Sequence, residues 1–450
     1  MTPPDLPVDN PLTDGIDDAV YQAAVTALFA RRPERMLPGL ERIEALMARL
    51  QHPQRAAPAV HLTGTNGKST LARMISSLLS AHGVLAGTYT SPHLQDVRER
   101  IRVGGRPIRR ADLLHDLAEL EPHLDAVEVA RGEMVTFFET LTALAYQRFA
   151  TAQVQASVVE VGMGGRWDAT NVVEAEVAVI NPVRLDHAEL GSTVADVAGE
   201  KAGIISPGAT CVVAEQDQAA ARVIEAEARA QGATQLLAGR DFDVAARRPH
   251  DSGQELTLRA AGRTIAGVEL PLLGSHQADN AAVALAATAA LLGRVDAEAV
   301  QAGFAAVESP GRLEVVPPAR AGQPPVLLDG AHNPAGAAAL ASALEADFGT
   351  RRRVLVLAAM GDKDCAGIVE ALLPVADAIV VTEAPTGRSA PADRLGKLCR
   401  LAGRQAEVQP DPVAALTRAG QLAGDQAIVV VTGSLYLVGA AREALGLGVV

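Results

Sequence analysis

Residues that could bind phosphate groups and a metal ion gather in one short segment of the sequence, HLTGTNGKST. Gly64 and Gly67 let the backbone approach phosphate oxygens, and Lys68 could neutralise the β- and γ-phosphates. The Ser69 hydroxyl could reach Mg²⁺. An apolar strand pattern precedes the segment and a helical pattern follows it, so we predict a nucleotide phosphate loop. The match is incomplete, because Leu62 occupies the first glycine position of the P-loop pattern, and a Gly-rich turn without a ligand is the alternative.

Two later segments carry oxygen atoms that a hard cation prefers. Ser91 lies in TSPHL, where its hydroxyl is a plausible ligand, and Glu160 lies in the strand-like run VVEV before the loop GMGGR. A carboxylate in an otherwise apolar strand is costly unless it is paired or binds a cation. An ion pair between Glu160 and Arg166 and a metal site at Glu160 are therefore both open.

A third strand pattern, 177–180, is followed by Asp186 and His187, a compact pair of possible ligands. Lys201 lies in the helical run GEKAGII, where the residues alone favour a surface lysine paired with Glu200. The three clusters follow the carboxyl ends of expected strands, where open α/β sheets bind their ligands. Their shared location favours one common site.

The sequence pattern of the strands and helices that must hold these residues indicates an α/β fold. Short β-branched runs alternate with Ala- and Leu-rich helical stretches, such as 71–82 and 278–292, which predicts mostly parallel strands wrapped by helices. Scarce aromatics, 3% of residues, fit such a core. The expected strands are 57–62, 157–161, 177–180, 211–214, 326–328, 354–357, 378–382 and 427–431.

Two departures from this alternation suggest the domain organisation. Runs 255–260 and 263–268 predict an antiparallel hairpin, within a small insertion near 241–270. The sequence SPGRL, at a break before a new α/β series, places a boundary near residue 310. We therefore expect an ATP-binding domain over 1–308 and a smaller Rossmann-like α/β domain over 309–450. The Pro- and Gly-rich segment 317–325 is an alternative break.

Composition narrows the class of protein. The formal charge of −13 argues against a nucleic-acid partner, since phosphate backbones need a basic surface. Cys211, Cys365 and Cys399 are too scattered for a metal or disulfide pattern. No apolar run approaches the ~20 residues that span a bilayer, and the N-terminus lacks signal-peptide features. We expect a cytoplasmic protein with no membrane partner.

An ordered set of motifs gives the chain a family likeness. It resembles the folylpolyglutamate synthase and dihydrofolate synthase family of the Mur ligase superfamily, over roughly residues 40–440. DGAHNP and GSLY favour this folate branch over the peptidoglycan branch. In chain order the motifs are GTNGK, SPHL, TFFE, EVGMGG, DATN, the Asp-His pair, EKAGI, SPGRLE, DGAHNP and VTGSLY.

The resemblance implies roles for individual residues. It implies that Lys201 is carbamylated, which turns a cation into a carboxylate-like group, and that Ser69 or Thr70 supplies the hydroxyl that faces the metal. Thr63 departs from the alanine common in the family. Nucleotide contacts are implied for Gly64, Thr65, Asn66, Gly67, Lys68, Ser69, Thr70, Asn280 (adenine), Arg312 (phosphate), Asp329 and His332; Mg²⁺ contacts for Ser91, Glu160 and His187; and substrate contacts for His332 and Ser434.

The resemblance also implies an activity. We expect an ATP- and Mg²⁺-dependent ligase that joins L-glutamate to a tetrahydrofolate carboxylate through an acyl phosphate, with Lys68, His187, Lys201 and Arg312 as catalytic residues. The family implies a monomer. A bifunctional enzyme that also attaches the first glutamate to dihydropteroate is the nearest alternative, followed by a Mur-type ligase for another carboxylate. A non-catalytic nucleotide-binding regulator on the same fold is the alternative from another class.

Overall fold

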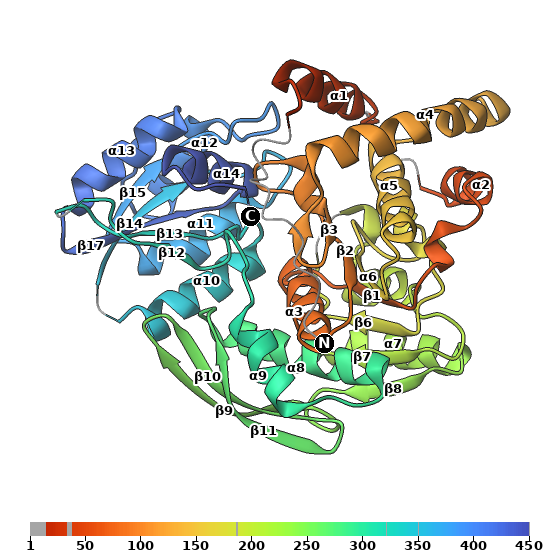
Figure 1. Cartoon of the computed structure of the whole chain (residues 1–450). Coiled ribbons are helices and arrows are strands. Elements are labelled where there is room, and N and C mark those ends of the chain that lie inside the picture. Colours follow the sequence, from red (N-terminus) through yellow and green to blue (C-terminus); the bar gives the residue numbers. More distant parts are fainter. Residues whose placement is uncertain (1–14, 34–37, 186–187, 321, 350, 450) are drawn as a thin grey trace.

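The computed structural model describes residues 15–33, 38–185, 188–320, 322–349 and 351–449. It has two α/β parts, each built on its own sheet, and a small antiparallel sheet beside them (Figure 1). The first sheet has eight strands and the last has six, and most neighbours within both are parallel. The α/β fold class predicted from the sequence is confirmed.

The first sheet has the order β4-β3-β2-β5-β1-β6-β7-β8, in which β3 pairs antiparallel with both β2 and β4. Every residue of β1, β5 and β6 is buried, because helices cover both faces of these central strands. The strands are β1 Ala59–Thr63, β2 Ala86–Tyr89, β3 Ile101–Val103, β4 Arg106–Pro107, β5 Ala156–Glu160, β6 Val177–Ile180, β7 Thr210–Val213 and β8 Thr234–Leu237.

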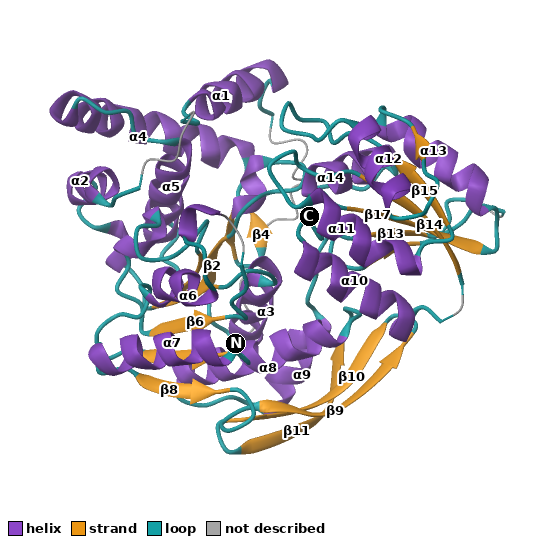
Figure 2. Ribbon diagram, turned by 180° about the vertical axis from the view of Figure 1, so that it is seen from behind, coloured by secondary structure: helices purple, strands orange, loops and turns teal. Residues whose placement is uncertain are grey.

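Helices α3, α8 and α9 pack together on one face of this sheet, while α6 and α7 cover β6 and β7 on the other (Figure 2). Seven of the twelve buried residues of α8 are alanine, which lets this helix approach its neighbours closely. The helices of this part are α1 Asp18–Ala30, α2 Glu41–Arg49, α3 Lys68–Ala81, α4 Arg110–Arg131, α5 Phe137–Thr151, α6 Val194–Ala202, α7 Gln218–Ala230, α8 Ser275–Leu292 and α9 Ala297–Ala305, with short 3₁₀ turns at Pro53–Arg55, Val97–Arg100, Ala169–Val172 and Ala188–Leu190.

The antiparallel sheet has the order β11-β10-β9 and lies against α8 and α9 (Figure 1). The predicted hairpin is confirmed as β10 Gly253–Ala260 and β11 Arg263–Leu270. A third strand, β9 Asp243–His250, was not predicted. Its sequence, DVAARRPH, lacks the apolar alternation of a half-buried strand and contains a proline, and five of its eight residues are exposed.

The C-terminal sheet has the order β12-β13-β17-β14-β15-β16, with only β12 antiparallel to its neighbour. Helix α10 begins with Pro334 at its first turn, and the Asn333 side chain accepts a hydrogen bond from the Gly336 N–H, a standard N-cap. The elements are β12 Glu314–Val316, β13 Val326–Leu328, α10 Pro334–Asp347, β14 Arg352–Leu357, α11 Cys365–Leu372, a 3₁₀ turn Leu373–Val375, β15 Ala378–Val381, α12 Ala392–Leu401, β16 Glu407–Val408, α13 Pro412–Ala423, β17 Ala427–Thr432 and α14 Leu435–Ala444.

The two α/β parts meet where the loop after β2 packs on α14. Arg442 is 2% exposed and donates a hydrogen bond from Nε to the Gln95 Oε1 atom at 2.9 Å. Gly439 packs directly under this loop, since a Cβ atom there would lie 2.3 Å from the Leu94 carbonyl oxygen. These contacts hold the loop that carries Ser91 against the second sheet. The domain boundary near residue 310 stays a prediction.

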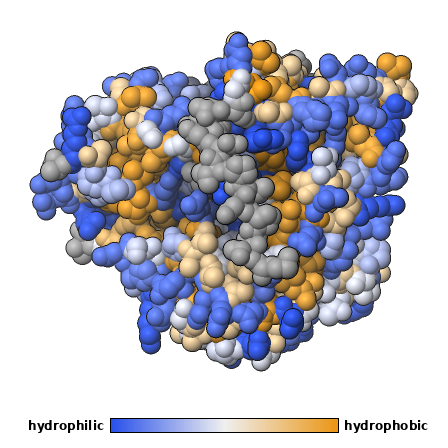
Figure 3. Space-filling model, in the orientation of Figure 1, coloured by the Kyte–Doolittle hydropathy of each residue, from blue (hydrophilic) through white to orange (hydrophobic). Residues whose placement is uncertain are grey.

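The surface is mixed in character. Hydrophobic and hydrophilic residues are interspersed over the face seen in Figure 3, and hydrophilic residues follow much of its outline. Within the described residues, no helix is long and apolar enough to cross a membrane.

Candidate functional site

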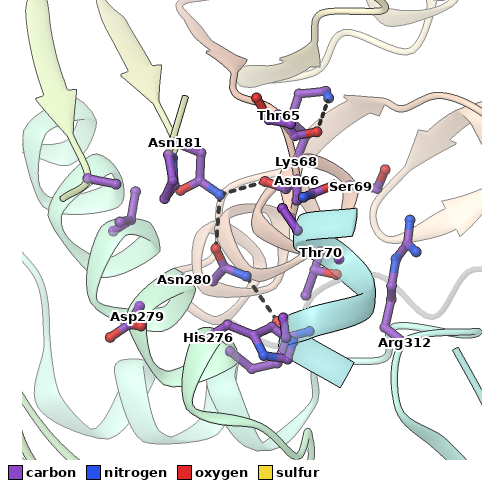
Figure 4. A pocket seen from close by; sticks show the side chains of 18 of the residues that line it. Thr65, Asn66, Lys68, Ser69, Thr70, Asn181, His276, Asp279, Asn280 and Arg312 are labelled. Atoms are coloured by element: carbon purple, nitrogen blue, oxygen red, sulfur yellow. Dashed lines mark hydrogen bonds between the residues drawn. The ribbon is translucent and has the colours of Figure 1, made fainter. Parts of the chain in front are cut away.

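A cavity of about 950 Å³ opens between the first sheet, the antiparallel sheet and the C-terminal part. The phosphate-loop segment lies at its centre, and α8 and α10 form two of its walls (Figure 4). The cavity thus collects residues from both predicted domains. Of the residues predicted from the sequence, its lining contains Thr65, Asn66, Gly67, Lys68, Ser69, Thr70, Ser91, Glu160, Asn280, Arg312, Asp329 and His332.

The phosphate-loop segment connects β1 to α3, and its glycines are required by the local geometry. At Gly64, φ is +151° and a Cβ atom would lie 2.6 Å from the Asn181 Cβ. At Gly67, φ is +80°, a conformation that other residues rarely adopt. Lys68 opens the helix, and its Nζ atom donates to the Gly64 carbonyl oxygen at 3.0 Å. The loop therefore presents a cation and helix N-terminal N–H groups at one point.

Glu160 is the last residue of β5, next to the end of β1, and is 1% exposed. Its Oε1 atom accepts from the Ser69 Oγ and its Oε2 from the Ser91 N–H, each at 3.0 Å. Burial raises the pKa of Glu160, while the nearby Lys68 ammonium acts in the opposite direction. Arg166 pairs instead with Glu227, at 3.0 Å, so the predicted ion-pair alternative for Glu160 is wrong.

The second α/β part contributes further lining residues. Asp329 follows β13, and its carboxylate accepts from the N–H groups of Leu313 and Ala331, each at 2.9 Å. His332 donates from Nδ1 to the Gly330 carbonyl oxygen at 2.8 Å. Figure 4 shows Arg312 on the same side of the cavity as Ser69 and Thr70. Backbone hydrogen bonds thus fix the carboxylate and the imidazole next to the arginine.

Amide side chains line the end of the cavity beyond the phosphate loop. The Asn181 Nδ2 donates to the Asn66 carbonyl oxygen and to the Asn280 Oδ1, both at 3.0 Å, and the Asn280 Nδ2 donates to the Gln277 Oε1 at 3.0 Å (Figure 4). Next to these amides, burial and the nearby Glu215 raise the pKa of Asp279. This end offers both donors and acceptors to a ligand.

Several predicted residues lie differently from what the sequence suggested. Lys201 is 4% exposed and donates from Nζ to the Gly64 carbonyl oxygen at 2.9 Å, so a surface lysine is wrong. Gly64, Lys201 and Ser434, all within the described part of the chain, are not among the lining residues. The Ser434 hydroxyl caps α14, and its neighbour Leu435 lines the cavity. His187 lies outside the described residues.

The structure also resolves which hydroxyl faces Glu160. Ser69 does, whereas the Thr70 Oγ1 lies 2.8 Å from the Ser309 Oγ, in a buried contact between the phosphate-loop helix and the second part. Sequence reasoning missed Asn181, although this residue directly follows the expected strand 177–180, and it assigned no role to Asn333 within DGAHNP. Position at a strand's carboxyl end could have identified Asn181.

Comparison with known proteins gives consistent matches over nearly the whole chain. Residues 62–288 match the model of the Mur ligase middle domain, and residues 311–435 match that of the Mur ligase glutamate ligase domain. The "Dihydrofolate synthase/folylpolyglutamate synthase" of Mycobacterium tuberculosis is 41% identical, over 93% of this chain and 92% of the relative.

Solved structures agree with these matches. M. tuberculosis folylpolyglutamate synthase complexed with ADP and AMPPCP superposes with a TM-score of 0.91 at 40% identity, covering 96% of this chain and 100% of that one. Escherichia coli FolC in complex with DHPP and ADP superposes with a TM-score of 0.84 at 31% identity, covering 95% of this chain and 97% of that one.

Proposed function

The chain belongs to the folylpolyglutamate synthase and dihydrofolate synthase family of ATP-dependent Mur ligases, and from that premise we propose that it joins L-glutamate to the glutamyl carboxylate of tetrahydrofolate. One observation carries the proposal. Lys68, Ser69 and Glu160 from the first part line a single cavity together with Arg312 and Asp329 from the second. Such a site can bring a nucleotide phosphate, a metal ion and a carboxylate substrate together.

The nucleotide would lie along the cavity from the phosphate loop to the amides of α8. Lys68 and the N–H groups at the start of α3 would hold the β- and γ-phosphates, and Arg312 would contact phosphate from the second part. Asn280 would contact the adenine. The relative from M. tuberculosis was solved with ADP and AMPPCP, which supports nucleotide in this cavity.

The residues present fit a Mg²⁺ ion. Glu160 offers a buried carboxylate, and the Ser69 and Ser91 hydroxyls are further oxygen donors on the same wall. A carboxylate buried to 1% exposure is costly without a cation. Arg166 does not supply one, and the nearby Lys68 ammonium offsets only part of the cost, since the pKa of Glu160 is still raised. His187 stays a predicted ligand. When bound, Mg²⁺ would neutralise phosphate charge; the protein's own part is to orient the Glu160 carboxylate by two hydrogen bonds.

A carbamate on Lys201 has a specific geometric argument. Lys68 and Lys201 both donate to the same Gly64 carbonyl oxygen, at 3.0 and 2.9 Å. Two ammonium groups that share one acceptor repel each other, whereas a carbamate on Lys201 would attract Lys68. Native mass spectrometry with and without bicarbonate tests this. A mass gain of one CO₂ that disappears in Lys201→Ala is expected, and its absence would contradict the carbamate.

The reaction would proceed in two stages. The folate carboxylate attacks the ATP γ-phosphorus, which forms an acyl phosphate and releases ADP. The glutamate amine then attacks the acyl carbon, and the tetrahedral intermediate loses phosphate as the amide forms. Lys68 and Arg312 would stabilise the charge of the transferred group. Because Lys68 and Arg312 come from different parts of the chain, closure of the two parts would assemble the site and exclude water from the acyl phosphate.

A second activity has a specific observation in its favour. The M. tuberculosis relative carries both synthase names at 41% identity, so dihydropteroate is the alternative acceptor of glutamate. The test is to incubate the protein with Mg-ATP, glutamate and either tetrahydrofolate or dihydropteroate, and to measure product mass. A gain of one glutamate on tetrahydrofolate alone indicates the monofunctional enzyme, and gains on both indicate the bifunctional one. No gain on either substrate would overturn the folate assignment. We propose a monomer, divided into domains near residue 310.

A further inference from the structure

An amide pair joins the phosphate loop to the second α/β part. The Asn333 Nδ2 donates to the Asn66 Oδ1 at 3.0 Å, and the Asn66 Nδ2 donates back to the Asn333 Oδ1 at 3.3 Å. Asn333 is 5% exposed, so water competes poorly for its amide, while Asn66 is half-buried. We propose that Asn333 is a positioning residue, which holds α10 against the phosphate loop and so completes the nucleotide cavity. The inference rests on the proposed function, because it assumes that a nucleotide occupies this cavity.

The amide pair extends into a chain that crosses the cavity floor. From Asn66 the contacts continue through its carbonyl oxygen to Asn181, then to Asn280 and Gln277 on α8. Gly67 lies against this chain, since a Cβ atom there would be 3.0 Å from the Asn181 and Asn280 amide nitrogens. The side chain at the start of α10 is therefore connected to the predicted adenine contact through the phosphate loop itself.

The other end of α10 is fixed to the same helix α8 by a different contact. Asp347, the last residue of α10, accepts from the Gly274 N–H, just before α8, at 2.8 Å. The Arg247 Nη2, on β9, also donates to Asp347, whose side chain is 1% exposed. Helix α10 is thus held at both ends, and between them its residues Ala335 and Leu340 line the cavity.

The nature of these contacts predicts how much nucleotide affinity is lost when the Asn66–Asn333 pair is removed. The nucleotide can contact α10 only while α10 stays in place, so its apparent affinity scales with the fraction of molecules in that arrangement. Loss of the two hydrogen bonds of the pair should weaken nucleotide binding about tenfold. The pair carries no charge, so the loss should not depend on ionic strength.

The variant Asn333→Ser tests the pair without removing the helix cap. Serine is also a preferred N-cap residue and can still accept from the Gly336 N–H, but it is too short to reach Asn66. The matched control is Asp411→Ser, which makes the same kind of change at the N-cap of α13, away from the cavity. Asn66→Ala removes the other partner.

The experiment measures binding of the β,γ-methylene analogue of ATP by calorimetry, at low and high salt. Asn333→Ser should bind about tenfold more weakly at both salt concentrations, with Asp411→Ser unchanged. In an Asn66→Ala background, Asn333→Ser should have no further effect, which a merely structural role would not produce. In Asn333→Ser and in Asn66→Ala, backbone amide exchange should also be faster than in the wild type across residues 64–68, but not in β17.

Two failures can be distinguished. If the wild-type protein does not bind the analogue, the proposed function is wrong and this inference falls with it. If the wild-type protein binds and Asn333→Ser binds equally well, or if the effects of the two substitutions add, this inference alone is wrong. Should Asn333→Ser fail to fold, backbone amide exchange of residues 64–68 is compared between Asn66→Ala and the wild type. An unchanged exchange rate would then overturn the inference.

Discussion

Replacing Glu160 by glutamine keeps the size of the side chain and removes its charge. In the structure the carboxylate accepts from the Ser69 Oγ and the Ser91 N–H, each at 3.0 Å. A glutamine oxygen can still accept from the Ser91 N–H, while its NH₂ group donates to the Ser69 hydroxyl, which can reverse its role. We therefore expect Glu160→Gln to fold with its hydrogen bonds intact and without the charge that would hold Mg²⁺.

The substitution should act in opposite directions on stability and on turnover. Burial raises the pKa of Glu160, which means that its surroundings disfavour the ionised form. Removing the charge should therefore raise the thermal unfolding midpoint of the ligand-free protein at neutral pH. Turnover should fall about 10²–10³-fold, the usual loss when one preorganised electrostatic contact is removed. Mg²⁺ with ADP should raise the midpoint of the wild type and not that of the variant.

The assay pairs thermal unfolding with phosphate release. Glu176→Gln is the matched control, because Glu176 also accepts a backbone hydrogen bond, from the Ala59 N–H at 2.6 Å, at the opposite end of β1. It should keep both turnover and the response to Mg²⁺. The reasoning about Glu160 is refuted if Glu160→Gln retains full turnover, or if Mg²⁺ with ADP stabilises it as much as the wild type.

Three further predictions concern single residues. Lys68→Ala should lower kcat about 10²–10³-fold in the phosphate-release assay; an unchanged rate would exclude Lys68 from the reaction. Gly433→Ala should lower the free energy of unfolding in urea by about 3 kcal/mol, because φ is +94° and the new Cβ would lie 1.9 Å from the Ala358 carbonyl oxygen, whereas Gly424→Ala, with no atom within 4 Å, should cost less. Burial lowers the pKa of His61 to about 3. Between about pH 3 and 6.5 the unfolded chain therefore binds more protons at this histidine than the folded chain does. The free energy of unfolding should then fall by up to about 1.4 kcal/mol for each pH unit of acidification. His61→Gln should therefore lose less stability than the wild type between pH 7 and 5 in urea unfolding; an equal loss would contradict this.

The sequence predicts most of the first wall of the site. Lys68, Glu160 and Ser91 lie at the carboxyl ends of separate strands, and parallel strands bring these ends to one edge of a sheet, so their proximity follows from the pattern alone. The central strands were also predictable, because helices cover both of their faces and this leaves continuous apolar runs. Strand β9 lacks such a run and was missed.

Pairwise contacts between distant segments could not be predicted. Asn66 and Asn333 are 267 residues apart, and nothing in the polar motif around either shows that their amides meet. The alternatives for Glu160 were open for the same reason, since Arg166 finds its partner Glu227 on α7 rather than nearby. Lys201 was expected to be a surface residue because Glu200 beside it offers an ion-pair partner, and only the packing of α6 reveals its burial.

The alanines of α8 have a consequence for how the protein responds to a ligand. An alanine side chain has no rotatable heavy-atom torsion, so seven buried alanines neither lose rotamer entropy on folding nor offer alternative rotamers afterwards. The wall that carries Asn280 is thus stiff before any nucleotide arrives, and binding against it costs little ordering. Any adjustment to the ligand must then come from the loops around the cavity, which makes α8 the fixed reference against which they move.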